Sequence, residues 1–134
     1  DEAWRQPLPG SWPDDQRTVF EASGRTNEEQ EAFEFIRGLA NWRKGAIATH
    51  EGTMKHFIPE NGTYVYFRLH EEQTVMVLVN TTEEETRLDA KRFQEVLGSF
   101  KSAEHVLNGD RFELGSELVL PPNEASVWEL TNEL

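Results

Sequence analysis

The stretch from Thr26 to Lys44 constrains the fold most, because it predicts one long amphipathic helix in a chain otherwise rich in strand and coil signals. Thr26 and Glu29 have the spacing of a capping box, in which each side chain accepts the other residue's backbone N–H. Gly45 provides a stop for the helix. A broad apolar face runs along it at helical spacing and comprises Ala32, Phe33, Phe35, Ile36, Leu39, Ala40 and Trp42, with the stem of Arg43 alongside. We expect this face to be buried.

The first 25 residues predict a coil, because proline and glycine recur in them at a density that interrupts both helices and sheet ladders. These breakers are Pro7, Pro9, Gly10, Pro13 and Gly24. Trp4 and Trp12 lie in the coil, which is typical of a loop that belongs to a larger body. A short helical turn is expected between Asp14 and Ala22.

Short strand signals follow the helix at close spacing. The expected strands cover residues 46–49, 53–58, 63–70, 73–80, 83–88, 103–107, 111–114, 117–120 and 125–130. One or two helical turns are expected over residues 90–97. Asn61-Gly62 and Asn108-Gly109 are hairpin signals, and Glu71-Glu72 marks another tight turn.

The strand over residues 73–80 is the most apolar, which predicts a central position with both faces buried. Several short strands with turn signals between them predict an antiparallel sandwich. The expected fold is therefore mainly β: an antiparallel β-sandwich preceded by a coil and one long amphipathic helix.

Size and charge exclude several classes of protein. The chain has 134 residues, whereas an eight-stranded α/β barrel needs roughly 250. Its net charge of −12 argues against binding to nucleic acid or to an anionic membrane surface. The longest purely apolar run, Val75 to Val79, is too short for a membrane span.

The residues suggest no catalytic, metal or cofactor site. His50, His56, His70 and His105 lack the spacing of a helical zinc site, and the sequence contains no cysteine. No serine stands in a nucleophile-elbow motif and no glycine-rich phosphate loop is present. Carboxylates are abundant, but no pair among them can be assigned to acid–base work, so we nominate no catalytic residue.

The tryptophans are more informative, because the apolar face of a sugar ring stacks on a flat aromatic side chain. Trp4 and Trp12 lie in the coil, where the backbone could present them to a glycan. The alternative is that they anchor the coil to a missing body. Trp42 and Trp128 fall on core-facing patterns and are expected to pack inside the protein.

The order of these signals resembles the C-terminal end of an α-amylase superfamily glycoside hydrolase, most of all the neopullulanase and cyclomaltodextrinase-like branch. The resemblance is carried by residues 5–12 (RQPLPGSW), 24–26 (GRT), 33–44 (FEFIRGLANWRK), 57–68 (FIPENGTYVYFR) and 74–81 (TVMVLVNT).

The resemblance implies that residues 1–45 are the end of a (β/α)8 barrel, its last loop and helix, and that residues 46–134 are the C-terminal antiparallel β-sandwich. In such enzymes the catalytic Asp nucleophile, Glu acid/base and third Asp lie on earlier barrel strands, and no histidine here precedes an aspartate. No catalytic residue is therefore carried over. Trp4, Arg5 and Trp12 are the candidate substrate contacts.

We therefore expect an accessory domain of a retaining glycosidase that acts on α-glucans such as starch, maltooligosaccharides or cyclomaltodextrins. Its implied partners are the catalytic barrel and, through it, the glucan; the helix face would pack against the barrel and the sandwich. Two alternatives stay open: a carbohydrate-binding β-sandwich module, and an oligomerisation module that forms homo-oligomers through exposed apolar surface. A periplasmic or secreted parent is favoured, with a cytoplasmic one left open.

Overall fold

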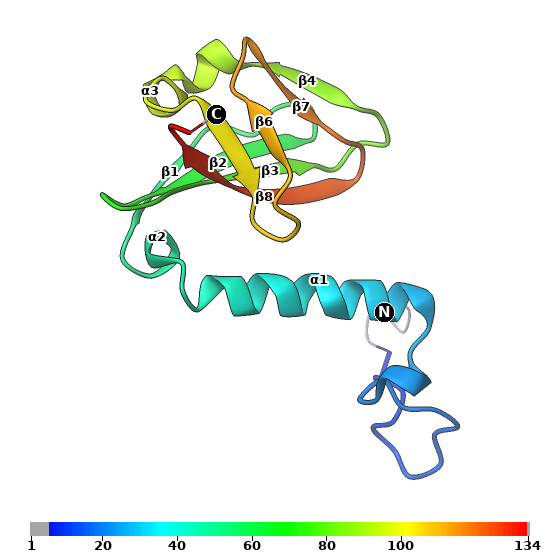
Figure 1. Ribbon diagram of the computed structural model, residues 1–134. Coiled ribbons are helices and arrows are strands. Elements are labelled where there is room, and N and C mark those ends of the chain that lie inside the picture. Colours follow the sequence, from blue (N-terminus) through cyan, green and yellow to red (C-terminus); the bar gives the residue numbers. More distant parts are fainter. Residues whose placement is uncertain (1–5, 134) are drawn as a thin grey trace. The chain divides into compact units, whose positions relative to one another are not determined.

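A computed structural model describes residues 6–133 of the chain (Figure 1). It divides into two compact units, one ending at Ala40 and one beginning at Asn41. The model contains no helix with the length and apolar character needed to cross a bilayer, within the residues it describes.

The first unit holds a loop, the one-turn 3-10 helix η2 (Ala22–Gly24) and most of helix α1 (Asn27–Arg43). The predicted capping box is confirmed: the Thr26 N–H donates to Glu29 Oε2 at 2.8 Å, and the Glu29 N–H donates to Thr26 Oγ1 at 3.2 Å. The turn expected between residues 14 and 22 is wrong in position, since helical geometry is confined to η2.

The apolar face of α1 is only partly covered within its own unit. No residue of α1 is buried, and Ile36 is 65% exposed. The loop of the same unit therefore leaves part of the apolar stripe uncovered.

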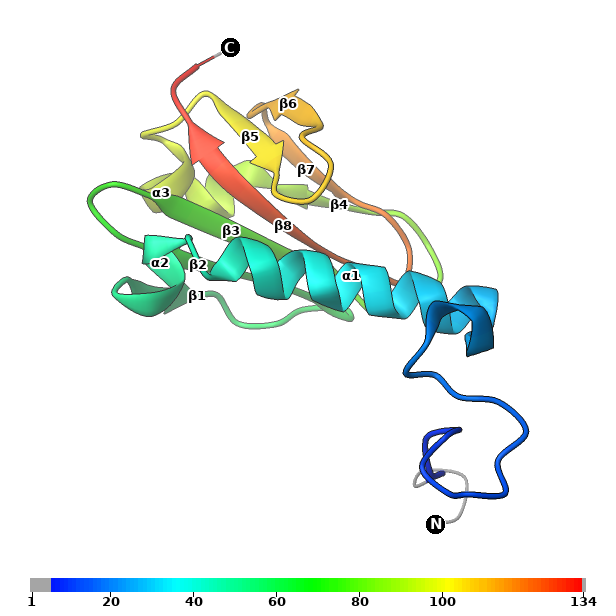
Figure 2. The same ribbon diagram turned by 60° about the horizontal axis from the view of Figure 1, so that its bottom comes forward.

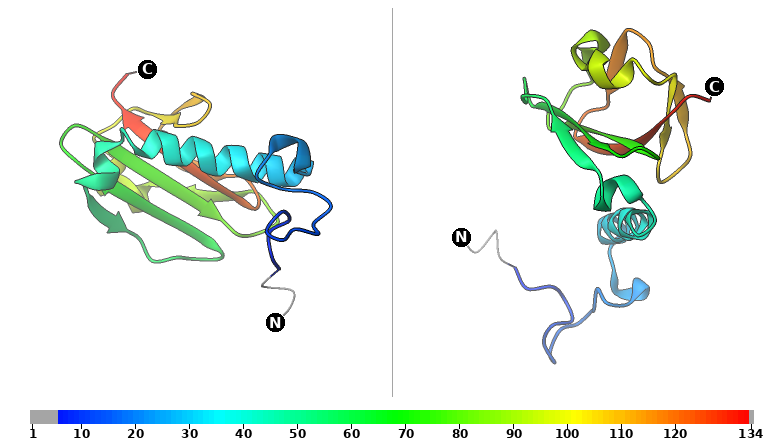
Figure 3. Two further views of the ribbon diagram at one scale, coloured as in Figure 1. Left: turned by 90° about the horizontal axis from the view of Figure 1, so that it is seen from below. Right: turned by 90° about the vertical axis from the view of Figure 1, so that its left-hand side faces the viewer.

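The second unit is an antiparallel β-sandwich, as the sequence predicts (Figure 1, Figure 3). The larger sheet has six strands in the order β1-β2-β3-β8-β5-β6. Their bounds are β1 Thr53–His56, β2 Thr63–Leu69, β3 Thr74–Asn80, β8 Glu124–Thr131, β5 Ser102–His105 and β6 Arg111–Glu113. The smaller sheet pairs β4 (Thr86–Asp89) with β7 (Glu117–Leu120).

Strand β3 lies inside the larger sheet between β2 and β8, and six of its seven residues are buried, so the predicted central strand is confirmed (Figure 2). The hairpin signals are confirmed too. Asn61 and Gly62 both have positive φ, at 48° and 76°, which is the geometry of a type I′ turn. His70 and Gln73 exchange backbone hydrogen bonds across the predicted Glu71-Glu72 turn.

Residues 46–49 were predicted as a strand, and here the structure corrects the sequence. Ile47–His50 form the short helix α2. The guanidinium of Arg68, on β2, donates to the Ala48 carbonyl at 3.1 Å and to the Gly52 carbonyl at 2.6 Å. These tertiary bonds satisfy carbonyls that a four-residue helix leaves without partners, and they override the local strand propensity.

The main core lies between the two sheets. The larger sheet contributes Val65, Phe67, Met76, Leu78, Ala103 and Leu130, and the smaller one contributes Leu118 and Leu120. The expected helical turns over residues 90–97 are confirmed as η3 (Ala90–Phe93) and α3 (Gln94–Leu97). Their Phe93, fully buried, lies edge-on to Phe57 with ring centroids 4.9 Å apart, which closes one side of the core.

Candidate functional site

Trp12 is presented by a turn that one carboxylate organises. Asp15 Oδ2 accepts the backbone N–H of Gly10 at 2.7 Å and that of Trp12 at 3.1 Å. The Asp15 N–H in turn donates to the Trp12 carbonyl at 3.2 Å. Trp12 itself is 66% exposed. The backbone at this tryptophan is thus held in place while its ring stays in solvent.

Two glycines let this loop fold tightly around Thr18. Gly10 has φ +96°, and a Cβ there would lie 2.3 Å from Thr18 Oγ1. A Cβ on Gly24 would lie 1.9 Å from the Thr18 carbonyl oxygen. Both approaches are impossible for any other residue without movement of the backbone. The proline- and glycine-rich sequence therefore forms a specific packed loop.

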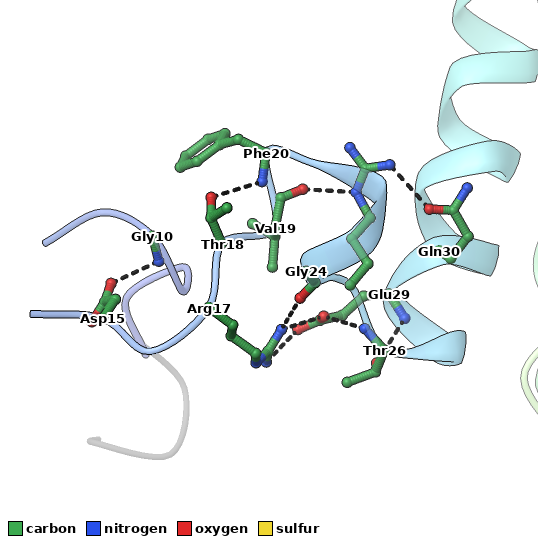
Figure 4. A network of polar contacts seen from close by, with 11 residues as sticks. Gly10, Asp15, Arg17, Thr18, Val19, Phe20, Gly24, Thr26, Glu29 and Gln30 are labelled. Carbon is green, nitrogen blue, oxygen red and sulfur yellow. Dashed lines mark hydrogen bonds and ion pairs between the residues drawn. The ribbon is translucent and has the colours of Figure 1, made fainter. Parts of the chain in front are cut away.

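Arg17 clamps the loop to the first turn of α1 (Figure 4). Its guanidinium donates to Glu29 Oε2 at 2.6 Å, to Glu29 Oε1 at 2.9 Å and to the Gly24 carbonyl at 3.0 Å. Hydrogen bonding from Arg17, and secondarily from the Thr26 N–H, lowers the pKa of Glu29 from 4.5 to about 2. The capping carboxylate thus stays ionised and serves the loop and the helix together.

Arg25 makes a second link of the same kind. Its Nε donates to the Val19 carbonyl at 2.7 Å and its Nη1 donates to Gln30 Oε1 at 3.0 Å (Figure 4). The guanidinium lies 3.6 Å from the centroid of the Phe33 ring, a cation–π contact. Loop and helix therefore form one surface in this unit.

That surface contains an apolar hollow of about 600 Å³, which we call the loop–helix hollow. The loop contributes Leu8, Val19 and Phe20, and α1 contributes Ala32, Phe33 and Ile36. Leu8, Phe20 and Ile36 are each more than three-fifths exposed. Contiguous exposed apolar side chains of this kind mark a protein–protein interface or a ligand groove.

Of the three predicted substrate contacts, Trp12 is exposed on the loop, and Trp4 and Arg5 lie outside the described residues. Both remaining tryptophans pack inside the protein, as predicted: Trp128 is half-buried against the main core, and Trp42 against a separate cluster of Ala48, Val75 and Val77. Among residues 6–133, His, Asp and Glu side chains form no group of three that could hold a metal ion.

The sequence reasoning missed the residues that build the loop, namely Asp15, Arg17 and Arg25. Arg17 and Glu29 are separated by 12 positions, and no local motif connects them. The capping box was the one sequence signal that could have pointed to this contact. It placed the Glu29 carboxylate at the start of the helix, close to the loop that contains Arg17.

Comparison with known proteins agrees with this architecture. The family model of the cyclo-malto-dextrinase C-terminal domain matches residues 54–129, more than half of the chain. This match spans the strands from β1 to β8.

Solved structures share the fold at low identity. They include an α-amylase from Geobacillus thermoleovorans complexed with acarbose (19% identity, TM-score 0.66, 82% of this chain and 24% of that one). An α-amylase from Anoxybacillus matches with 17% identity and a TM-score of 0.67 over 91% of this chain and 26% of that one. The trehalulose synthase MutB from Pseudomonas mesoacidophila matches with 19% identity and a TM-score of 0.54 over 74% and 18%.

The chain thus spans about a quarter or less of the length of these enzymes. Its own sandwich, and not a catalytic barrel, carries the family match. The chain belongs to the cyclo-malto-dextrinase C-terminal domain family.

Proposed function

We propose that the chain is the non-catalytic C-terminal end of a retaining glycosidase that acts on α-glucans, and that it docks on the catalytic barrel of that enzyme. Residues 1–45 would be the last loop and helix of the barrel, and residues 46–134 its C-terminal sandwich. The nucleophile, the acid/base and the third carboxylate would lie on barrel strands upstream. A neopullulanase or cyclomaltodextrinase-like parent is the branch we favour.

One observation carries the proposal: α1 and its loop expose an apolar surface that their own unit does not cover. Ile36 and Phe20 are the most exposed members of the loop–helix hollow. Full burial of such a side chain contributes about 1.5–3 kcal/mol, so a few of them supply a substantial docking energy. In a barrel, the last helix packs its apolar face on the strands and on its neighbouring helices.

The loop has a second role in this proposal. Loops that follow barrel strands build the active-site face of a (β/α)8 enzyme. Trp12, presented on the turn that Asp15 organises, would then lie at the rim of the substrate cleft together with Trp4 and Arg5. An exposed indole suits stacking on the apolar face of a glucose unit.

The proposal can be tested by reassembling the parent enzyme from two separately expressed parts. The region upstream of Asp1 would be expressed separately from residues 1–134, and the two would be mixed and analysed by size-exclusion chromatography with light scattering. We expect a 1:1 complex that hydrolyses a chromogenic maltoside, with no hydrolysis by residues 1–134 alone. Ile36→Asp should weaken the complex, whereas Glu31→Gln, on the polar side of α1, should not.

Other outcomes would favour the alternatives. Self-association of residues 1–134, abolished by Ile36→Asp and unaffected by the upstream region, would favour an oligomerisation module. Hydrolysis by residues 1–134 alone, or an upstream region without a barrel, would refute the proposal.

A further inference from the structure

A second hollow, which we call the sheet hollow, lies wholly within residues 41–134 and has a volume of about 320 Å³. Its lining comprises Trp42, Glu104, His105, Val106, Gly109, Glu129 and Thr131. Glu129 and Thr131 alternate along β8 with the core residue Leu130, so they lie on the outer face of the larger sheet.

Two carboxylates stand directly opposite each other in this hollow. Glu104 on β5 and Glu129 on β8 are partners in the sheet register. Side chains paired in this way lie side by side, and like charges there are destabilising. Residue pairs that do not favour stability often occur at functional sites, so the Glu104–Glu129 pair suggests that this face binds a ligand.

Each carboxylate is oriented by one dedicated donor. Arg111 Nε donates to Glu104 Oε2 at 2.6 Å, and Gln73 Nε2 donates to Glu129 Oε2 at 3.1 Å. The orientation of Gln73 is fixed in turn, because its Oε1 accepts the Ala48 backbone N–H at 3.0 Å. Among the hydrogen bonds of the described residues, none involves the Oε1 atom of either glutamate. Each carboxylate therefore keeps an oriented oxygen for a ligand.

Trp42 supplies an aromatic wall. It packs against the outer-face cluster of Ala48, Val75 and Val77, yet it also lines the sheet hollow. Its indole is thus held by packing while part of it stays accessible. Among the side-chain hydrogen bonds of the described residues, none uses its indole N–H, so this donor is available to a ligand.

The lining selects a neutral polyhydroxyl ligand. An anion would meet two carboxylates, and a cation would find Glu104 already paired with Arg111. Sugar hydroxyls donate to carboxylate oxygens, and the C–H face of a pyranose ring packs on an indole. The volume lies at the lower end of the ~300–1,000 Å³ range of small-molecule sites, which suits about one or two sugar rings.

We propose that the sheet hollow is a glucan-binding site, in which Glu104 and Glu129 accept hydroxyl hydrogen bonds and Trp42 packs on a ring. The choice of an α-glucan rests on the function proposed above. This site is separate from the Trp12 loop and would let the sandwich hold a glucan chain on its own.

The test uses residues 1–134 labelled with ¹⁵N and titrated with maltotriose, followed by the indole N–H and backbone amide signals. We expect saturable shifts of the Trp42 indole and of the amides of Val106 and Glu129. Glu129→Gln should weaken the affinity about tenfold, because a charged acceptor is lost. Glu124→Gln is the matched control, since it lies on the same strand and outside the hollow.

Three results would overturn the inference: no shifts, shifts confined to Trp12, or shifts that calcium chloride produces and maltotriose does not. Equal loss of affinity in Glu129→Gln and Glu124→Gln would overturn it as well. None of these results affects the reassembly test, which depends on the loop–helix hollow. Failure of the glucan site and failure of the proposed function are therefore distinguishable.

Discussion

The side-chain amide of Asn80, at the end of β3, donates a hydrogen bond of 3.2 Å to the backbone carbonyl of Leu120, at the end of β7. This bond joins the larger sheet to the smaller one. The same amide also donates to the Pro121 carbonyl at 3.0 Å, and its oxygen accepts from the backbone and hydroxyl of Thr82. Asn80 is 2% exposed and its bond to the Leu120 carbonyl is buried, so water does not replace the amide there.

Asn80→Ala should therefore destabilise the sandwich by roughly 2–4 kcal/mol, because it leaves buried carbonyl oxygens without donors. Chemical denaturation followed by tryptophan fluorescence measures the change. Asn41→Ala, at an exposed position on α1, should cost less than about 1 kcal/mol. Equal losses for the two variants would show that Asn80 does not hold the sheets together.

Burial separates Ile36 from Phe93, although both are large apolar residues. Phe93 is fully buried and Ile36 is 65% exposed. Phe93→Ala should lower the free energy of unfolding by about 3–5 kcal/mol, and Ile36→Ala by less than about 1 kcal/mol. Comparable losses, measured by urea denaturation of residues 1–134, would mean that the α1 face is part of the core of this chain.

Replacement of Gly62 should destabilise the sandwich, because its backbone conformation and its close neighbours leave no room for a side chain. It has φ +76° in the I′ turn, and a Cβ would lie 2.6 Å from the Thr82 methyl carbon. Gly62→Ala should destabilise the sandwich by about 1–2 kcal/mol. Gly115→Ala serves as the control, since a Cβ there meets nothing within 4 Å, and it should be neutral or slightly stabilising. Thermal melts of both variants provide the comparison.

The Arg17–Glu29 pair gives the loop a defined pH dependence. The pKa of Glu29 is lower in the folded loop than its ordinary 4.5, so the pair's stabilisation is complete above pH 4.5 and is lost as the pH falls through about 2. An NMR titration of the Glu29 side-chain carboxyl should give a midpoint near pH 2. In Arg17→Gln the midpoint should rise toward 4.5, and an unchanged midpoint would contradict the clamp.

The local signals of the sequence predicted much of the fold. The capping box, the helical spacing of the apolar residues and the Asn-Gly turns each act over a few positions, and each is found in the structure. The apolar composition of residues 73–80 was enough to predict a central strand, because a strand with this many apolar residues is typically covered on both faces.

Residues 47–50 show where local signals fail. Their composition favours a strand, but they form a helix, and Arg68 donates to the Ala48 carbonyl from a strand that begins 13 residues later. The loop before α1 is a second example. Its proline and glycine residues predict a coil, but its conformation is set by contacts of Arg17, Thr18 and Arg25 that the sequence pattern does not indicate.

The sequence by itself determined the amphipathic helix and the strand-rich tail, because both depend on neighbouring residues or on composition. Tertiary structure alone decided which apolar side chains are covered, how Asn80 joins the sheets, and that Glu104 and Glu129 face each other beside Trp42. These features depend on the register and packing of segments that lie far apart in the chain, and no local pattern records that pairing.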